Sequence, residues 1–191
     1  MAEKRTHFGM AGRYAAMSEF LLRGYNVAVP SVDVGDDVFV VDDQDGSLRR
    51  VQVKTADAGD EREIRAADGR VTQQATHSTL SRRQLRTGKS SELYFMLMTR
   101  WGDRWRFLLV PRLDFVRLRD EFHTRNRARV RGPKPKADDA AKTDSLGLEV
   151  VWTESNATGW GVSLREYLDT WPADLPELKV GPGAVSPPVL P

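Results

Sequence analysis

The chain contains no cysteine, only three histidines, and no apolar run long enough to cross a bilayer. Without thiols it has no disulfide, no thiolate zinc site and no cysteine nucleophile. The three histidines lie far apart in sequence, which argues against a histidine-rich metal site. The first residues also lack the apolar segment of a signal peptide. These absences predict a soluble, cytoplasmic protein with no membrane partner.

A strong net charge is also missing, because 29 lysines and arginines stand against 27 acidic residues and leave a net charge of +2. The bulk charge therefore says little about partners, and the distribution of charge along the chain matters more. With 40% apolar and 29% charged residues, the composition is that of an ordinary globular domain. A length of 191 residues suits one domain with a tail.

Hydrophobic periodicity and turn residues predict the order of the elements. Helices are expected at 10–23, 78–86, 113–122 and 163–171, the last because Ser163 and Glu166 form a capping box. Strands are expected at 26–29, 38–41, 48–55, 92–99, 104–110 and 148–152, with a small hairpin around 68–69. A polar, basic loop is expected at 123–145 and a tail rich in proline and glycine at 172–191. We therefore predict an α/β (or α+β) domain over 1–171, with one central mixed sheet flanked by helices.

The segment Val51-Gln52-Val53-Lys54 carries the first chemical signal. Residues two apart on a strand face the same way, so Gln52 and Lys54 share one face while the valines pack on the other. A lysine beside an amide on an inner strand is costly unless an anion or a substrate lies there. Asp37 begins the preceding strand, and Glu19 lies on the helix before it, so both could approach Gln52.

Two carboxylates and an amide oxygen are hard ligands that suit Mg²⁺, or Mn²⁺ in its place. Such a metal acidifies a bound water and stabilises charge on a scissile phosphate. Lys54 would orient the attacking water or help to deprotonate it, and would offset developing negative charge. The set formed by Glu19, Asp37, Gln52 and Lys54 therefore predicts hydrolysis of a phosphodiester.

The runs GDDVFVV (35–41) and RVQVKT (50–55), preceded by a helix with Glu19, resemble the PD-(D/E)xK nuclease superfamily. The resemblance is to the branch with glutamine in place of the second acid, which includes a group I intron homing endonuclease. It implies a restriction-endonuclease-like domain. It also implies that Asp37 is the metal-binding aspartate, Gln52 the substituted acid, Lys54 the catalytic lysine and Glu19 the helix glutamate, with the backbone carbonyl of Val53 as a further metal ligand. Asp36 and Asp33 lie close to Asp37 and remain alternatives for the metal-binding aspartate.

Two basic clusters could track a phosphate backbone. The larger one places six positive charges in twelve residues, with no acid from 122 to 137; it consists of Arg125, Arg127, Arg129, Arg131, Lys134 and Lys136. The smaller one consists of Arg82, Arg83, Arg86 and Lys89. A solvated basic loop is the alternative for either cluster. Beside a phosphodiesterase site, nucleic-acid binding is the better interpretation, with DNA favoured and RNA open because the metal site recognises phosphate.

Together these features predict a Mg²⁺-dependent DNA endonuclease. Cutting both strands of a duplex needs two sites, which favours a homodimer or a higher homo-oligomer. Two rival hypotheses stand beside it. In one, the protein is a non-catalytic nucleic-acid-binding or assembly module with a nuclease-like fold. In the other, it is a component of a defence or repair system that a partner must activate.

Overall fold

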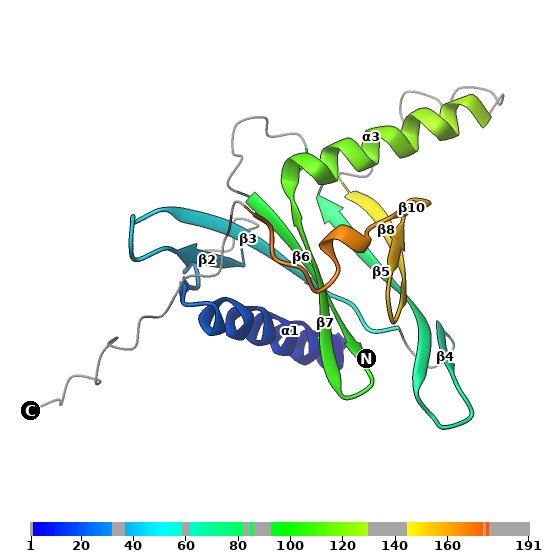
Figure 1. Cartoon of the computed structure of the whole chain (residues 1–191), viewed down its shortest axis with the longest axis horizontal. Coiled ribbons are helices and arrows are strands. Elements are labelled where there is room, and N and C mark those ends of the chain that lie inside the picture. Colours follow the sequence, from blue (N-terminus) through cyan, green and yellow to red (C-terminus); the bar gives the residue numbers. More distant parts are fainter. Residues whose placement is uncertain are drawn as a thin grey trace, which may run out of the picture.

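The computed structural model describes residues 2–31, 37–58, 62–81, 85, 93–129, 145–173 and 175 (Figure 1). Two α-helices are present in this part of the chain, α1 (Ala2–Leu22) and α3 (Arg112–Arg129). The central sheet consists of β1 (Asn26–Ala28), β2 (Val38–Val41), β3 (Leu48–Thr55), β6 (Leu93–Trp101) and β7 (Arg104–Pro111). The second sheet consists of β4 (Glu63–Arg65), β5 (Val71–Ser81), β8 (Ser145–Thr153), β9 (Ala157–Gly159) and β10 (Val162–Ser163). A short 3₁₀ helix, η2 (Arg165–Tyr167), follows β10.

The central sheet has the order β1-β2-β3-β6-β7 and is mixed. Strands β3 and β6 pair in parallel, whereas the other neighbours pair antiparallel. The predicted α/β class with a central mixed sheet and flanking helices is confirmed. The second sheet, with the order β10-β9-β8-β5-β4, is antiparallel throughout and was not predicted as a separate sheet. Two of its parts were predicted: the hairpin around 68–69, which β4 and β5 form, and the strand at 148–152, which lies within β8.

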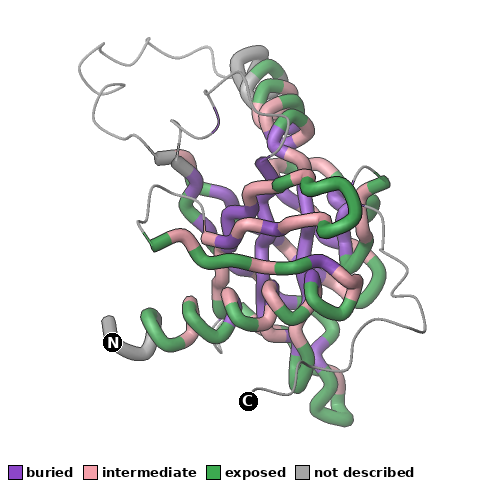
Figure 2. Tube along the Cα trace, turned by 90° about the vertical axis from the view of Figure 1, so that its left-hand side faces the viewer, coloured by how far each residue is buried: buried purple, intermediate pink, exposed green. Residues whose placement is uncertain are grey.

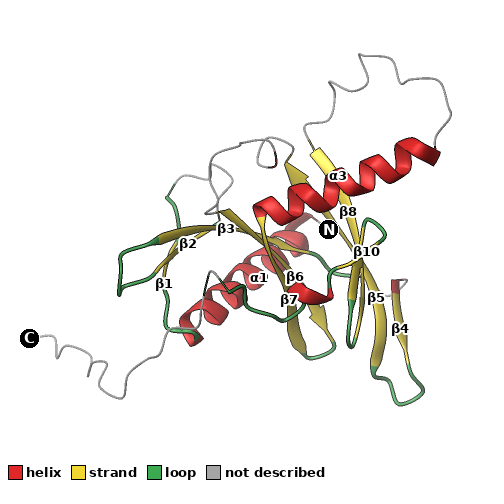
Figure 3. Ribbon diagram, turned by 45° about the horizontal axis from the view of Figure 1, so that its top comes forward, coloured by secondary structure: helices red, strands yellow, loops and turns green. Residues whose placement is uncertain are grey.

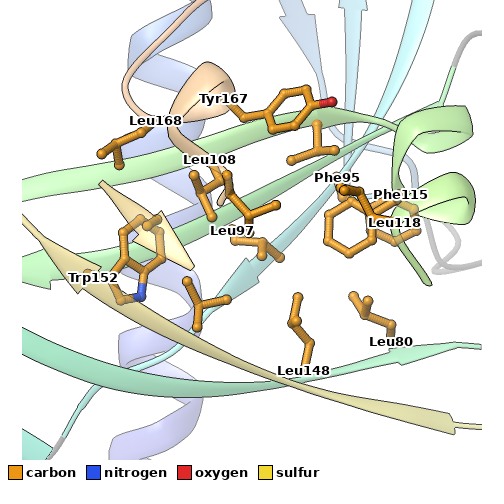
Figure 4. Packing of buried hydrophobic residues seen from close by; sticks show 14 of the residues in the cluster. Leu80, Phe95, Leu97, Leu108, Phe115, Leu118, Leu148, Trp152, Tyr167 and Leu168 are labelled. Atoms are coloured by element: carbon orange, nitrogen blue, oxygen red, sulfur yellow. The ribbon is translucent and has the colours of Figure 1, made fainter. Parts of the chain in front are cut away.

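The central sheet separates two apolar cores. Helix α1 lies along one face of the central sheet (Figure 3). There Ala16 and Phe20 pack against alternate residues of the sheet, including Val51 and Val53 of β3. On the other face, the second sheet and α3 close a larger core, part of which Figure 4 shows. Buried residues gather in the strands, while α1 and α3 are exposed along much of their length (Figure 2). In the part of the chain that the structure describes, no helix is both long and apolar enough to span a membrane.

The ends of the helices differ from the prediction at α1 and α3. Helix α1 starts at Ala2 rather than at 10, and it ends as expected before Gly24, whose φ of +87° suits a helix-terminating glycine. Helix α3 continues to Arg129, so the predicted loop at 123–145 begins as helix. A basic segment without proline before Pro133 can remain helical, since arginine is a good helix former.

The predicted helix at 78–86 is wrong over its first residues. Residues 78–81 continue β5, whose pairing with β8 extends from Gln73 to Ser81. From Gln74 to Leu80 every second residue is buried, so the two-residue period of a strand explains this segment. Apart from Leu85, the rest of the predicted helix lies outside the described residues.

The predicted helix at 163–171 is also wrong. Ser163 ends β10, and its hydroxyl donates to Asn156 Oδ1 at 2.8 Å instead of capping a helix through Glu166. Only the short η2 forms there, because Asp169 takes a left-handed φ of +49° and pairs with the edge of β7. The chain then contributes Leu175, buried in the α1-side core, beyond the predicted domain end at 171.

Candidate active site

The pairing of strands β2 and β3 ends at Asp37, a place that we call the fork. A small cleft of about 240 Å³ opens there beside α1. Residues of α1 line one side and the end of β3 lines the other. The lining residues are Thr6, Gly9, Met10, Arg13, Asp37, Val53, Lys54 and Thr55. The cleft therefore contains three of the residues predicted from sequence: Asp37, Val53 and Lys54.

Asp37 is held at the fork by both its backbone and its side chain. Its N–H donates to the carbonyl of Val51 at 3.0 Å, as the last bond between the two strands. Its Oδ2 accepts the backbone N–H of Val53 at 2.9 Å, so the carboxylate continues the ladder beyond the last paired residue of β2. Its Oδ1 accepts from Arg13 Nη2 at 2.6 Å. The carboxylate is 14% exposed, which leaves it accessible from the cleft.

Gly12 brings α1 close enough to form this cleft. A methyl group at Gly12 would place its carbon 2.8 Å from Thr55 Cβ, which is closer than real side chains approach. The helix can therefore cross the end of β3 at this distance only with glycine at position 12. Gly9, one turn earlier, meets nothing within 4 Å and faces open space. The contact at Gly12 sets Arg13 beside Asp37.

Lys54 and the carbonyl of Val53 complete the cleft at the end of β3. Within the described part of the chain, the side chain of Lys54 forms no hydrogen bond or ion pair. The N–H and C=O of one strand residue point to the same side. Because the Val53 N–H points to Asp37, the Val53 carbonyl also points toward the fork. One carboxylate and one backbone carbonyl thus meet at this place, and the Lys54 side chain leaves β3 beside them on the face that it shares with Gln52.

Gln52 is buried and faces away from α1. It pairs with Phe95, which belongs to the core on the second-sheet side, whereas Val51 and Val53 face α1. The alternation predicted for this strand is thus present. However, Gln52 does not line the cleft, and its Oε1 has no hydrogen-bond partner in the described part of the chain.

Glu19 is engaged in a separate contact at the end of α1. Its carboxylate accepts from Arg23 at 2.7 Å, and its backbone carbonyl accepts from the same guanidinium at 2.8 Å. Arg23 also lies over the ring of Trp171, at 4.1 Å from the centroid. Glu19 therefore fastens the end of α1 to the segment after η2, and it does not line the cleft.

The structure describes only some of the remaining predicted residues. Arg125, Arg127 and Arg129 lie on the last turns of α3, on a helix rather than in a loop. The other predicted residues lie outside the described residues: Asp33, Asp36, Arg82, Arg83, Arg86, Lys89, Arg131, Lys134 and Lys136. No three histidine or acidic side chains of the described residues gather in a way that could hold a metal ion.

The donors at the fork nevertheless fit a magnesium ion. Mg²⁺ commonly takes one or two protein oxygens and completes its shell with waters and substrate phosphates. The Asp37 carboxylate and the Val53 carbonyl are two such hard oxygen donors on one edge of β3. Gln52 and Glu19 do not reach the same place in this structure, so the set of protein ligands is smaller than the sequence predicted.

A second cleft, of about 300 Å³, is slightly larger but has the wrong charge for a phosphate site. Its lining includes Asp114 and Glu166 and neither lysine nor arginine. Burial, together with these carboxylates, raises the pKa of the Tyr167 phenol well above its ordinary value. The phenol therefore stays neutral, and the cleft at the fork is the better candidate.

Arg13 and Gly12 are the site residues that sequence reasoning missed. Glycine inside a helix costs about 1 kcal/mol relative to alanine, so Gly12 inside the predicted helix at 10–23 was a signal that something packs there. Arg13 carried no comparable signal, since it lies 24 positions from Asp37 and looks like any arginine of a surface helix.

No family model and no curated protein matches this sequence. Among solved structures, a bacterial homing endonuclease is similar to this chain with a TM-score of 0.37 and 19% sequence identity. The similarity covers 59% of this chain and 72% of the homing endonuclease.

Proposed function

We propose that this chain is a metal-dependent nuclease of the PD-(D/E)xK type, acting as an endonuclease on DNA. The observation that carries the proposal is the meeting of Asp37, Val53 and Lys54 in one cleft at the fork of β2 and β3. These three residues come from the two sequence runs on which the resemblance to this superfamily rests. The cleft is small and open, as suits a site that admits one phosphate of an extended chain.

In this proposal, Asp37 and the Val53 carbonyl hold Mg²⁺, and Mn²⁺ can replace it. When bound, the ion lowers the pKa of a water ligand and stabilises charge on the phosphate. Lys54 orients the attacking water and, in its neutral amine form, accepts the proton of that water, since no other described group engages its amino group. Glu19 and Gln52 remain predicted ligands, and each has to turn from its present surroundings to reach the cleft.

In this proposal, the basic residues at the end of α3 and after it in the sequence bind the phosphate backbone of the nucleic acid. The last eight residues of α3 contain three arginines and no acid, whereas its first ten residues mix both signs. Contacts of this kind fix the position of the backbone without reading sequence. Cleavage of both strands calls for two copies of the site, so we propose a homodimer or a higher homo-oligomer.

Cleavage assays test the proposal directly. Supercoiled plasmid, linear duplex, single-stranded DNA and RNA are incubated with Mg²⁺, with Mn²⁺ or with EDTA. We expect metal-dependent cutting of DNA that falls about 100-fold or more in Lys54→Ala, as removal of a proton-transfer group does. Asp37→Asn should abolish the metal-dependent cutting, because it removes the carboxylate that holds the metal. Arg49→Ala is the matched control, because it removes a positive charge from β3 away from the cleft.

A specific observation favours the non-catalytic alternative as the second candidate. Arg13 already neutralises Asp37, and Gln52 faces the opposite side of the strand. If the folded wild type cuts nothing under any condition but binds nucleic acid with a steep salt dependence, the binding module replaces the nuclease. Cutting that begins only after a cell extract is added would favour the partner-activated system.

A further inference from the structure

We propose that Arg13 has two alternative partners: Asp37 in the metal-free protein, and a phosphate of the nucleic acid once a divalent cation has taken Asp37. The inference rests on the proposed function and names a substrate-binding residue that the sequence motif does not include. It also assigns the ion pair at the fork a role as a placeholder for the cation.

The two oxygens of Asp37 are held in different ways. Oδ2 accepts a backbone N–H of β3, which keeps the carboxylate at the fork whatever else happens in the cleft. Oδ1 accepts only from a side chain, that of Arg13, at 2.6 Å. A cation that approaches from the cleft therefore competes with the guanidinium for Oδ1. The two positive groups repel one another at this distance, so they do not share one oxygen.

The Arg13 side chain has the freedom to leave. It is 25% exposed and lines the cleft. Of the residues that the structure describes, Asp37 alone accepts from it. An arginine stem has several rotatable bonds, so a short swing keeps the guanidinium inside the cleft while it loses Asp37. Little besides the ion pair itself opposes this motion.

The charge of the cleft explains where Arg13 goes next. The residues that line the cleft include one acidic residue, Asp37, and two basic ones, Arg13 and Lys54. A bound divalent cation leaves both side chains without an anion. A phosphodiester carries the missing negative charge, and a guanidinium can donate two parallel hydrogen bonds to its oxygens. Arg13 thus binds a phosphate of the nucleic acid only after a divalent cation has bound to the Asp37 carboxylate. Metal binding is in this way coupled to nucleic-acid binding.

The first test is Mn²⁺ binding to the full chain by calorimetry, without nucleic acid. In Arg13→Gln, Mn²⁺ no longer competes with the guanidinium, so we expect about 5-fold tighter binding, equivalent to a part-buried ion pair of about 1 kcal/mol. Arg13→Lys keeps the charge and should resemble wild type. Asp37→Asn reports whether the cation binds at the fork at all. Thermal unfolding of each variant confirms that it is folded.

The second test needs no metal. A fluorescent DNA duplex is titrated in EDTA with Asp37→Asn and with the double variant Arg13→Gln, Asp37→Asn. Losing the carboxylate frees Arg13, so Asp37→Asn should bind the duplex about 5-fold more tightly than wild type, the worth of one added phosphate contact. Compared with Arg13→Gln alone, the double variant should gain less than about 2-fold, because the freed guanidinium is then missing.

The outcomes separate this inference from the proposed function. If Asp37→Asn weakens Mn²⁺ binding while Arg13→Gln leaves it unchanged or weaker, the metal site stands and Arg13 is a fixed brace of α1. If Asp37→Asn leaves Mn²⁺ binding unchanged, the proposed metal site fails. The EDTA titration then decides whether Arg13 contacts phosphate: a gain that persists in the double variant overturns that contact, and a gain that disappears supports it.

Discussion

Two aspartates make the same pair of contacts at different strands of the central sheet, Asp37 at β3 and Asp169 at β7. Asp37 accepts the backbone N–H of Val53 at 2.9 Å and binds Arg13 at 2.6 Å. Asp169 accepts the backbone N–H of Phe107 at 3.0 Å and binds Arg106 at 2.7 Å. In both places a carboxylate continues the hydrogen-bond ladder of a strand of the central sheet and neutralises a nearby arginine.

The two arginines, however, have very different surroundings. The Arg106 side chain is 4% exposed, donates a further hydrogen bond to the carbonyl of Thr153 at 2.7 Å, and lies 5.2 Å from the centroid of the Trp101 ring. Among the residues that the structure describes, Arg13 has one partner, and it faces a cleft. The Arg106–Asp169 pair is therefore a fixed structural contact, which we call the lock, because several groups surround the arginine. The Arg13–Asp37 pair is an exchangeable contact, because Asp37 alone of the described residues holds the arginine.

The largest effect is expected at the lock. Arg106→Ala leaves Asp169 and the Thr153 carbonyl without their donor, so the free energy of unfolding should fall by about 3 kcal/mol, as for a broken buried ion pair. Urea denaturation measures the change. Arg104→Ala on the same strand is the control: its side chain is 54% exposed and pairs with Glu154 at the surface, so the loss should stay below about 1 kcal/mol. Equal losses in the two variants would contradict the difference drawn here.

A smaller effect is expected at Gly12, where the cleft is built. Gly12→Ala forces α1 away from Thr55 and should reduce the free energy of unfolding by about 1–3 kcal/mol, as overpacked substitutions do. Gly9→Ala on the same helix meets open space and should stabilise by about 0.5–1 kcal/mol through helix propensity. Thermal unfolding of both variants makes the comparison. A stable Gly12→Ala would mean that α1 does not approach β3 so closely.

The smallest effect is expected at the exchangeable pair. Arg13→Gln should change the free energy of unfolding by no more than about 1 kcal/mol, because the pair is partly exposed and the glutamine can still donate to Asp37. Urea denaturation under the conditions used for Arg106→Ala allows the stability losses of the two variants to be compared directly. A loss as large as that of Arg106→Ala would make Arg13 a second structural lock and would remove the basis for an exchange of partners.

Much of the fold followed from local patterns. The central-sheet strands were predicted close to their observed bounds, because alternation along a strand and glycine-containing turns are local signals. The second sheet was missed because β5 is long and polar, and its buried face shows only against β8. The helix predicted at 163–171 failed for a similar reason, since Asp169 pairs with β7, some sixty residues earlier in the chain.

The candidate site divides along the same line. The sequence alone determined that Asp37, Val53 and Lys54 stand at neighbouring ends of two paired strands, because a hairpin and a period of two bring them there. It did not determine that Gln52 would be enclosed by the second-sheet core, nor that Glu19 would bind Arg23. Only the tertiary structure placed Arg13 on Asp37, since that contact depends on how closely α1 crosses β3, and Gly12 sets that distance.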